Sequence, residues 1–252
     1  MNSMKRVLNL ECLFATVVFA VAVPIADSAE LAKAISQSEN EPSALRAAIS
    51  TMTEESLEQQ YYHFARIAHV QELLGRRKMN QTKAHLKTAD SKRLEKFVHD
   101  HALKRLRGKW KPQAAKVART ILEESRKHQF DPLFLIAVIE NESSFNPDAR
   151  GTSGEIGLMQ ILPSSAPWIA AKVGQSYSGP TTLADLCQNI KLGAAYLDYL
   201  RKRFQWNGAL YLAAYNMGTT NVVRHIQRDS IPRVYPERVM KRYLNLYAAL
   251  TH

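Results

Sequence analysis

Glu142 is the side chain of this 252-residue chain best suited to acid–base chemistry. It follows an almost wholly apolar segment, residues 133–139, and a polar stretch comes after it. Burying a carboxyl beside apolar side chains is costly unless the group stays protonated or is paired. A carboxyl that is still protonated near neutral pH is what general-acid cleavage of a glycosidic bond requires. Periodicity alone also allows an ordinary helix-end glutamate that reaches solvent.

Glu140 precedes Glu142 by two residues. Two residues correspond to about 200° around an α-helix, so the two carboxylates cannot share one site as a paired acid and base. We therefore expect Glu140, and likewise Glu155, to be surface residues or supporting partners of the site.

The segment that carries Glu142 is predicted to be a buried helix over residues 133–143. Asp131 is a good N-cap, and Pro132 suits the first helical position. Residues 144–154 are expected to form a loop. Further helices are predicted over residues 114–127, 183–204, 210–216 and 238–250, with a short one after Pro163 and a turn bracketed by Pro232 and Pro236. No convincing strand pattern appears, so the fold class is all-α with little or no sheet.

The first residues have the pattern of an export signal. Lys5 and Arg6 precede a run over residues 7–23 that is apolar apart from Asn9, Glu11 and Thr16. Ala20-Val21-Ala22 is a plausible cleavage site, and Ala29 is a weaker one. We predict a signal peptide over residues 1–29 and a periplasmic protein, membrane-associated if the segment is kept as an anchor. Cleavage would remove Cys12 and leave Cys187 alone, without an intrachain disulfide.

Residues 30–110 are predicted to form a helical, basic N-terminal arm, with an amphipathic helix over residues 57–74. The stretch 76–109 is markedly basic, and the whole chain carries a formal charge of +11. This charge suits an anionic envelope surface, although a solvated helical face is the simpler interpretation. The compact catalytic domain is expected over residues 111–252.

Four motifs that begin at Glu142 favour the catalytic interpretation of this residue over that of an ordinary helix-end glutamate. They are Glu142-Ser143, Phe145-Asn146-Pro147, Gly157-Leu158-Met159-Gln160 and Ala213-Ala214-Tyr215-Asn216-Met217-Gly218. In this order and spacing they resemble the lytic transglycosylase family, of the soluble, SLT-domain, goose-type-lysozyme-like class. The resemblance covers roughly residues 111–247.

The resemblance implies a lysozyme-like helical fold that acts on peptidoglycan glycan strands. The expected reaction cleaves the β-1,4 bond between N-acetylmuramic acid and N-acetylglucosamine and leaves 1,6-anhydro ends. Glu142 is the expected catalytic acid and base. One carboxylate can suffice, because the attacking hydroxyl belongs to the same sugar and its effective concentration is high.

The resemblance also implies a set of substrate-binding residues. They are Ser143, Met159, Gln160, Tyr215 and Asn216. Each has a simpler interpretation as well: Ser143 could be an idle helix-end residue, Met159 could be core, and Tyr215 and Asn216 could satisfy local backbone groups.

The chain departs from the family pattern near its end. The family often has a glutamate four residues before a tyrosine, whereas here Glu237 precedes Tyr243 by six. Tyr235 and Glu237 are likewise shifted relative to the family's pattern. Glu237 and Tyr243 are therefore doubtful site residues.

Other functions are poorly supported. His99 and His101 point in different directions on a predicted helix, and no metal-ligand spacing or glycine-rich phosphate loop occurs, so no metal or cofactor is expected. No nucleic-acid partner is expected, because base-reading motifs are lacking. A hydrolytic muramidase and a non-catalytic wall-binding assembly factor remain the alternatives. The sequence leaves the oligomeric state open.

Overall fold

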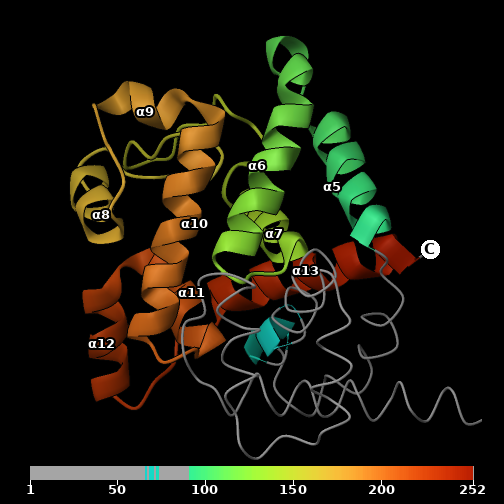
Figure 1. The fold of residues 1–252 in the computed structure, drawn as a ribbon. Helices are drawn as coiled ribbons and strands as arrows, with labels where there is room; N and C mark the ends of the chain where they lie inside the picture. The colour runs from blue at the N-terminus through green and yellow to red at the C-terminus, as the bar shows by residue number, and fades with distance from the viewer. Residues whose placement is uncertain (1–65, 67, 71, 74–90, 252) are drawn as a thin grey trace, which may run out of the picture. The chain divides into compact units, whose positions relative to one another are not determined.

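The computed structural model describes residue 66, residues 68–70, 72 and 73, and residues 91–251. The chain divides into two compact units, Met1–Ile67 and Ala68–His252, and every described residue except Arg66 lies in the second. Within residues 91–251 the helices are α5 (Ser91–Arg105), the short 3-10 helix η1 (Gly108–Gln113), α6 (Ala114–Lys127), α7 (Pro132–Ser143), α8 (Ala166–Val173), α9 (Pro180–Ala184), α10 (Leu186–Arg203), α11 (Gly208–Met217), α12 (Thr219–Gln227) and α13 (Val234–Thr251) (Figure 1).

Helix α7 is the buried centre of this unit. Every residue from Pro132 to Glu140 is buried, and the helix packs against α6 and α13 (Figure 1). A helix that is apolar all round must be covered on all sides, so the predicted buried helix is confirmed. Its start is fixed by the Asp131 side chain, which accepts a hydrogen bond of 2.8 Å from the Leu133 N–H. The Tyr247 hydroxyl of α13 donates to the other oxygen of the same carboxylate.

The predicted long helix over residues 183–204 is divided in the structure. Helix α9 ends at Ala184, and α10 begins at Leu186. Asp185 between them has extended backbone angles and caps α10, accepting a 2.8 Å hydrogen bond from the Gln188 N–H. The break arises because an aspartate N-cap requires a non-helical backbone, which periodicity does not reveal.

The last predicted helix begins four residues earlier than expected. The sequence predicts a turn between Pro232 and Pro236, but α13 starts at Val234 and contains Pro236 in its first turn. Proline is tolerated there because the first N–H groups of a helix have no intrahelical partner. Helix α12, which the sequence analysis did not predict, lies between α11 and α13.

The described residues contain isolated β-bridges and no strand. Arg150 pairs with Ile156, and Ile156 pairs with Ile161, across the loop that follows α7. The predicted all-α fold class is confirmed for the described part of the chain.

A short N-terminal piece belongs to the same unit as the helices above. Residues 68–70, 72 and 73 are helical, and His69 is buried against the rings of Phe130 and Phe134. The Asp131 N–H donates to His69 Nδ1 at 3.2 Å. Burial holds the pKa of His69 well below its usual value, so the ring is neutral and can accept this bond. Glu72 forms an ion pair of 2.5 Å with Arg201.

Most of the predictions for the N-terminal part fall outside the described residues. These are the signal peptide over residues 1–29 and most of the basic arm over residues 30–110. The boundary near residue 110 also stays a prediction, although α5 packs directly on α6. Among the described helices, none is both long and apolar enough to cross a membrane.

Candidate active site

Glu142 lies in the last turn of α7, where the chain changes direction sharply. The helix ends at Ser143, and Ser144 and Phe145 both have left-handed backbone angles, with φ of 51° and 64°. The Ser144 N–H donates to the Glu140 carbonyl at 3.2 Å, which closes the helix. Phe145 is buried immediately beyond the turn. The carboxyl of Glu142 is thereby held, half-buried, at the end of an apolar helix.

The environment of Glu142 favours the protonated carboxyl. Burial has the largest influence and raises the pKa of Glu142 from its ordinary 4.5 to about 7. The hydrogen bond from Tyr235 and the charge of Arg238 act in the opposite direction, while the charge of Glu155 raises the pKa further. A group with this pKa exists in both protonation states near neutral pH, which is what a general acid and base needs.

Tyr235 is the direct partner of Glu142. Its hydroxyl donates a hydrogen bond to Glu142 Oε1, and the residue is 4% exposed. Burial and the neighbouring carboxylate raise the pKa of Tyr235 well above its usual value, so the phenol stays protonated and remains a donor. Tyr235 stands in the first turn of α13, and the sequence offered only the shifted Tyr-Pro-Glu pattern as a signal for it.

The segment from Gly157 to Gln160 is held in place by buried Asn189 of α10. Asn189 Oδ1 accepts from the Met159 N–H at 2.8 Å, and its amide donates to the carbonyls of Ile156 and Leu183 at 2.9 and 3.0 Å. Gly157 has φ +81°, and a Cβ there would lie 2.6 Å from the Asn189 amide nitrogen. Sequence analysis missed Asn189, whose signal is a polar residue on the apolar stripe of a helix.

Two of the predicted residues converge on the same segment. The Tyr215 hydroxyl donates to the Met159 carbonyl at 2.8 Å. The Ser143 hydroxyl is 2.9 Å from the Leu158 carbonyl and 3.1 Å from the Ile139 carbonyl. Burial, then the charge of Glu142, raise the pKa of Tyr215 well above its usual value, which also places Tyr215 near the acid. Ser143 and Tyr215 thus join the end of α7, the Leu158–Met159 backbone and α11.

The other predicted binding residues have different surroundings. Met159 is fully buried and packs so closely on α10 that a Cβ on Gly193 would lie 2.5 Å from its sulfur. The Gln160 amide donates to the Gly157 carbonyl at 2.7 Å. Asn216 is exposed near the end of α11. Their roles toward a ligand stay predictions.

The two doubtful residues are not brought together. Tyr243 is fully buried in the core, with its ring edge-on to those of Phe134 and Tyr247 at centroid distances of 6.4 and 5.0 Å. Glu237 is exposed in the first turn of α13. Tyr235, two residues before Glu237, is the residue of this region that contacts Glu142.

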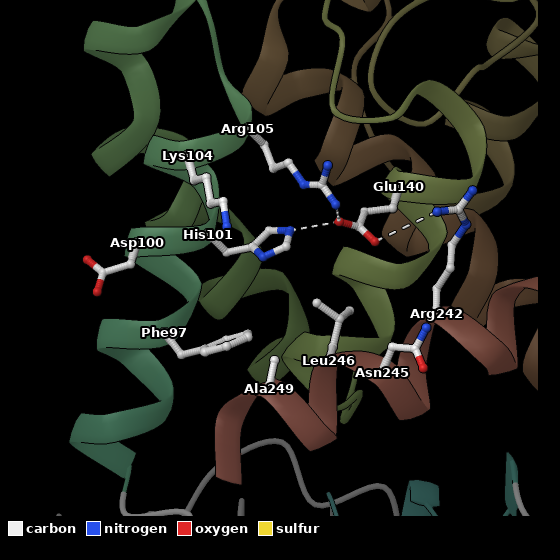
Figure 2. Close-up of a pocket in the computed structure, with 10 residues that line it drawn as sticks. All are labelled: Phe97, Asp100, His101, Lys104, Arg105, Glu140, Arg242, Asn245, Leu246 and Ala249. Carbon is white, nitrogen blue, oxygen red and sulfur yellow. Dashed lines mark hydrogen bonds and ion pairs between the residues drawn. The ribbon is translucent and has the colours of Figure 1, made fainter. Parts of the chain in front are cut away.

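Glu140 has the opposite electrostatic environment to Glu142. It faces a cavity of about 520 Å³ lined by residues of α5, α7 and α13 (Figure 2). Glu140 Oε1 lies 2.9 Å from His101 Nε2 and 2.5 Å from Arg105 Nη2, and Arg242 Nη1 is 4.0 Å from Oε2. Burial alone would raise the pKa of Glu140, but the hydrogen bond from His101 and the charge of Arg105 outweigh it and lower the pKa below its usual value.

The cluster around Glu140 is therefore ionised and structural, whereas Glu142 is poised to exchange a proton. In many enzymes, the different pKa values of two nearby carboxyl groups indicate which of them can donate a proton. His101 belongs to the Glu140 cluster, and among the described residues no three His, Cys, Asp or Glu side chains are grouped as metal ligands.

A half-buried carboxyl at the end of a central helix, hydrogen-bonded by a tyrosine, is a candidate acid–base site in an all-α protein. Residues 119–233 match the family model described as the Transglycosylase SLT domain. These residues are therefore a Transglycosylase SLT domain, and the resemblance to lytic transglycosylases is confirmed. Tyr235 and the rest of α13 lie beyond the matched segment.

Named relatives agree with this assignment. The chain is 36% identical over 90 residues to a soluble lytic murein transglycosylase of Escherichia coli, a match covering 35% of this chain and 14% of the relative. It is 30% identical over 145 residues to the membrane-bound lytic murein transglycosylase C of Actinobacillus succinogenes, covering 51% of this chain and 40% of the relative. The matches thus span well under two thirds of the relatives' length.

The comparison with solved structures matches the chain to an inactive mutant of the lytic transglycosylase Slt from Pseudomonas aeruginosa. It is 19% identical to this chain and superposes with a TM-score of 0.49, over 91% of this chain and 38% of that one.

Proposed function

We propose that this chain is a peptidoglycan lytic transglycosylase in which Glu142 is the general acid and base. The observation that carries the proposal is the half-buried carboxyl of Glu142, with a pKa of about 7, inside a Transglycosylase SLT domain. The names of the relatives, lytic murein transglycosylases, give the substrate class.

In the first step the protonated Glu142 carboxyl transfers its proton to the oxygen that bridges N-acetylmuramic acid and N-acetylglucosamine. The bond from the anomeric carbon to that oxygen breaks, and its electron pair stays on the leaving oxygen. Glu142 is then a carboxylate. The Tyr235 hydroxyl already donates to Glu142 Oε1, so it stabilises the charge formed at this moment.

In the second step the 6-hydroxyl of the same muramoyl sugar attacks the anomeric carbon, and its proton passes to the Glu142 carboxylate. The product carries a 1,6-anhydro ring, the acid is regenerated and no water is consumed. Because the attacking hydroxyl is tethered to the reacting sugar, no second carboxylate is needed to activate it.

The supporting residues divide by their surroundings. Ser143 and Tyr215 bond to the Leu158–Met159 backbone, so we assign them to positioning the wall of the site. Asn216 is exposed and can offer its amide to the acetamido and hydroxyl groups of a glycan. Gln160 is partly exposed, but its amide nitrogen already donates to the carbonyls of Gly157 and Ala149, so only its side-chain oxygen can accept from a glycan hydroxyl. Met159 is buried and is assigned to shaping the site from beneath.

The experiment that tests the proposal is digestion of purified peptidoglycan by the full chain and by Glu142→Gln, with mass analysis of the products. We expect wild type to release anhydro-ended fragments, lighter by one water molecule than hydrolytic products, and Glu142→Gln to release none while remaining folded. Glu123→Gln, an exposed residue of α6, is the matched control. Reducing ends would show a hydrolytic muramidase, and no cleavage by wild type would favour a non-catalytic wall-binding factor.

We also propose that the chain acts in the periplasm after export by residues 1–29, with the basic arm over residues 30–110 at the anionic envelope surface. Fractionation of cells that produce the full chain, with the mass of the mature N-terminus, tests this. An uncleaved chain in the cytoplasmic fraction would contradict it.

A further inference from the structure

A row of aromatic side chains leads from the neighbourhood of Glu142 to the protein surface. Tyr215, whose hydroxyl holds the Met159 carbonyl, lies with its ring 5.7 Å from that of Tyr196. The ring of Tyr196 stacks on that of Tyr199 at 6.2 Å, with 12° between their planes. Trp168 follows, 5.8 Å from Tyr199 and 6.2 Å from Tyr196.

Trp168 ends this row as an exposed yet oriented indole. It lies in α8, and 45% of its surface is exposed, although most large apolar side chains of the described residues are buried. Its ring is nearly perpendicular to both tyrosine rings, at 85° and 88°. Edge-to-face contacts on two rings fix its orientation. Helix α8 is itself anchored by buried Ile169 and Ala170.

Such an arrangement suits a ligand that is flat, apolar on its faces and polar around its rim. The electron-rich face of an indole attracts the weakly positive C–H groups of a pyranose ring, while the sugar hydroxyls stay in water. The Lys172 ammonium, 6.0 Å from the Trp168 centroid, adds a cation that can bond to hydroxyl or carboxyl groups. A protein partner would be expected to need a larger contiguous apolar patch.

We propose that Trp168, supported by Tyr199 and Tyr196, is a saccharide-stacking platform that binds the glycan strand away from Glu142. The inference rests on the proposed function for its substrate, peptidoglycan glycan, but assigns a separate binding position to that strand. The row of rings from α11 through α10 to α8 makes the platform continuous with the site around the acid.

The test is binding of uncleaved glycan, measured independently of catalysis. The inactive Glu142→Gln chain is titrated with soluble, uncrosslinked peptidoglycan glycan strands, alone and with Trp168→Ala, Trp168→Phe or Trp206→Ala added. Trp206 is 54% exposed and is the matched control. We expect Trp168→Ala to weaken binding about tenfold, Trp168→Phe to retain most of it, and Trp206→Ala to change it less than about twofold.

A second readout separates a platform from a merely structural role. In the active chain, Trp168→Ala should raise KM for long strands about tenfold with little change in kcat, and should have a smaller effect on the shortest cleavable oligosaccharide. Equal binding by the Trp168→Ala and Trp206→Ala chains, or a loss that is the same for all strand lengths, would overturn the platform. Absence of any cleavage by the wild-type chain would instead overturn the proposed function and leave the binding result standing.

Discussion

The Tyr235 hydroxyl donates a hydrogen bond to Glu142 Oε1 across 93 residues of sequence. The contact joins the first turn of α13 to the last turn of α7. It brings a buried phenol, which stays protonated, to a carboxyl whose pKa is raised to about 7. The tyrosine lies outside the segment that matches the domain family, so the proposed site extends beyond that segment.

Tyr235→Phe should raise the pKa of Glu142, because the hydrogen bond from Tyr235 favours the carboxylate and lowers that pKa. The alkaline limb of kcat/KM, where the acid loses its proton, should move about one pH unit higher. The rate at low pH should fall about tenfold, since the carboxylate formed in the first step loses a donor. A pH–rate profile measures both effects, and an unchanged profile would contradict the role given to Tyr235.

Glu142→Gln should stabilise the protein above pH 7. The pKa of Glu142 is about 7 in the folded chain and about 4.5 when unfolded, so between these values the folded chain holds a proton that the unfolded chain releases. The free energy of unfolding of wild type must therefore fall as pH rises from about 4.5 to 7. At pH 8 we expect Glu142→Gln to be more stable by about 1–3 kcal/mol, with no such gain at pH 4. Denaturant unfolding at the two pH values checks this; an equal effect at both would contradict the raised pKa.

Glu140→Gln should destabilise the fold. The variant replaces the carboxylate that pairs with Arg105 and bonds to His101 by a neutral amide, which keeps an acceptor oxygen but loses the negative charge that the neighbouring guanidinium groups face (Figure 2). We expect a loss of about 1–3 kcal/mol at pH 7, reduced by the partial exposure of Arg105. Because the pKa of Glu140 is lowered in the fold, this contribution should be present above about pH 4.5 and be lost as pH falls below that value. Glu95→Gln, exposed on α5, is the control; equal melting curves for the two variants would contradict the prediction.

Asn189→Ala should lower both stability and activity. It leaves the Met159 N–H and the carbonyls of Ile156 and Leu183 without the amide that satisfies them. We expect a loss of about 2–4 kcal/mol in the free energy of unfolding. Activity should fall even where the variant is folded, because the Gly157–Gln160 segment beside Glu142 loses its anchor. Gln188, exposed on the same helix, provides the control variant Gln188→Ala. Equal stability of the two variants would contradict the anchoring role of Asn189.

Gly157→Ala tests the contact between the same segment and Asn189 by adding a Cβ at position 157. Its φ of +81° is unfavourable for alanine, and the added Cβ would meet the Asn189 amide at 2.6 Å and the Leu183 carbonyl at 2.9 Å. We expect a loss of more than about 2 kcal/mol together with reduced cleavage. Gly174→Ala shares the positive φ but has open space around its Cβ, and should cost about 1 kcal/mol. A thermal unfolding series comparing both variants with wild type separates backbone strain from the close contact.

Local chemistry accounts for the elements that the sequence predicted well. Helix α6 has the predicted bounds, and α7 begins where Asp131 and Pro132 indicated, because caps and apolar periodicity act within a few residues. The break at Asp185 and the early start of α13 were not predicted. Aspartate and proline are each compatible with more than one backbone path, and the packing of the neighbouring helices decides which is taken.

Helical periodicity and the lack of a strand pattern predicted the all-α class, and the order of motifs indicated the domain family and singled out Glu142 as the candidate acid. The sequence could not determine the partner of Glu142, because Tyr235 and Glu142 are distant along the chain and meet only when α13 crosses α7. Nor could it show that the pKa of Glu140 is lowered while that of Glu142 is raised: the pKa of a carboxyl depends on how deeply it is buried and on which charges face it, and both are properties of the tertiary structure.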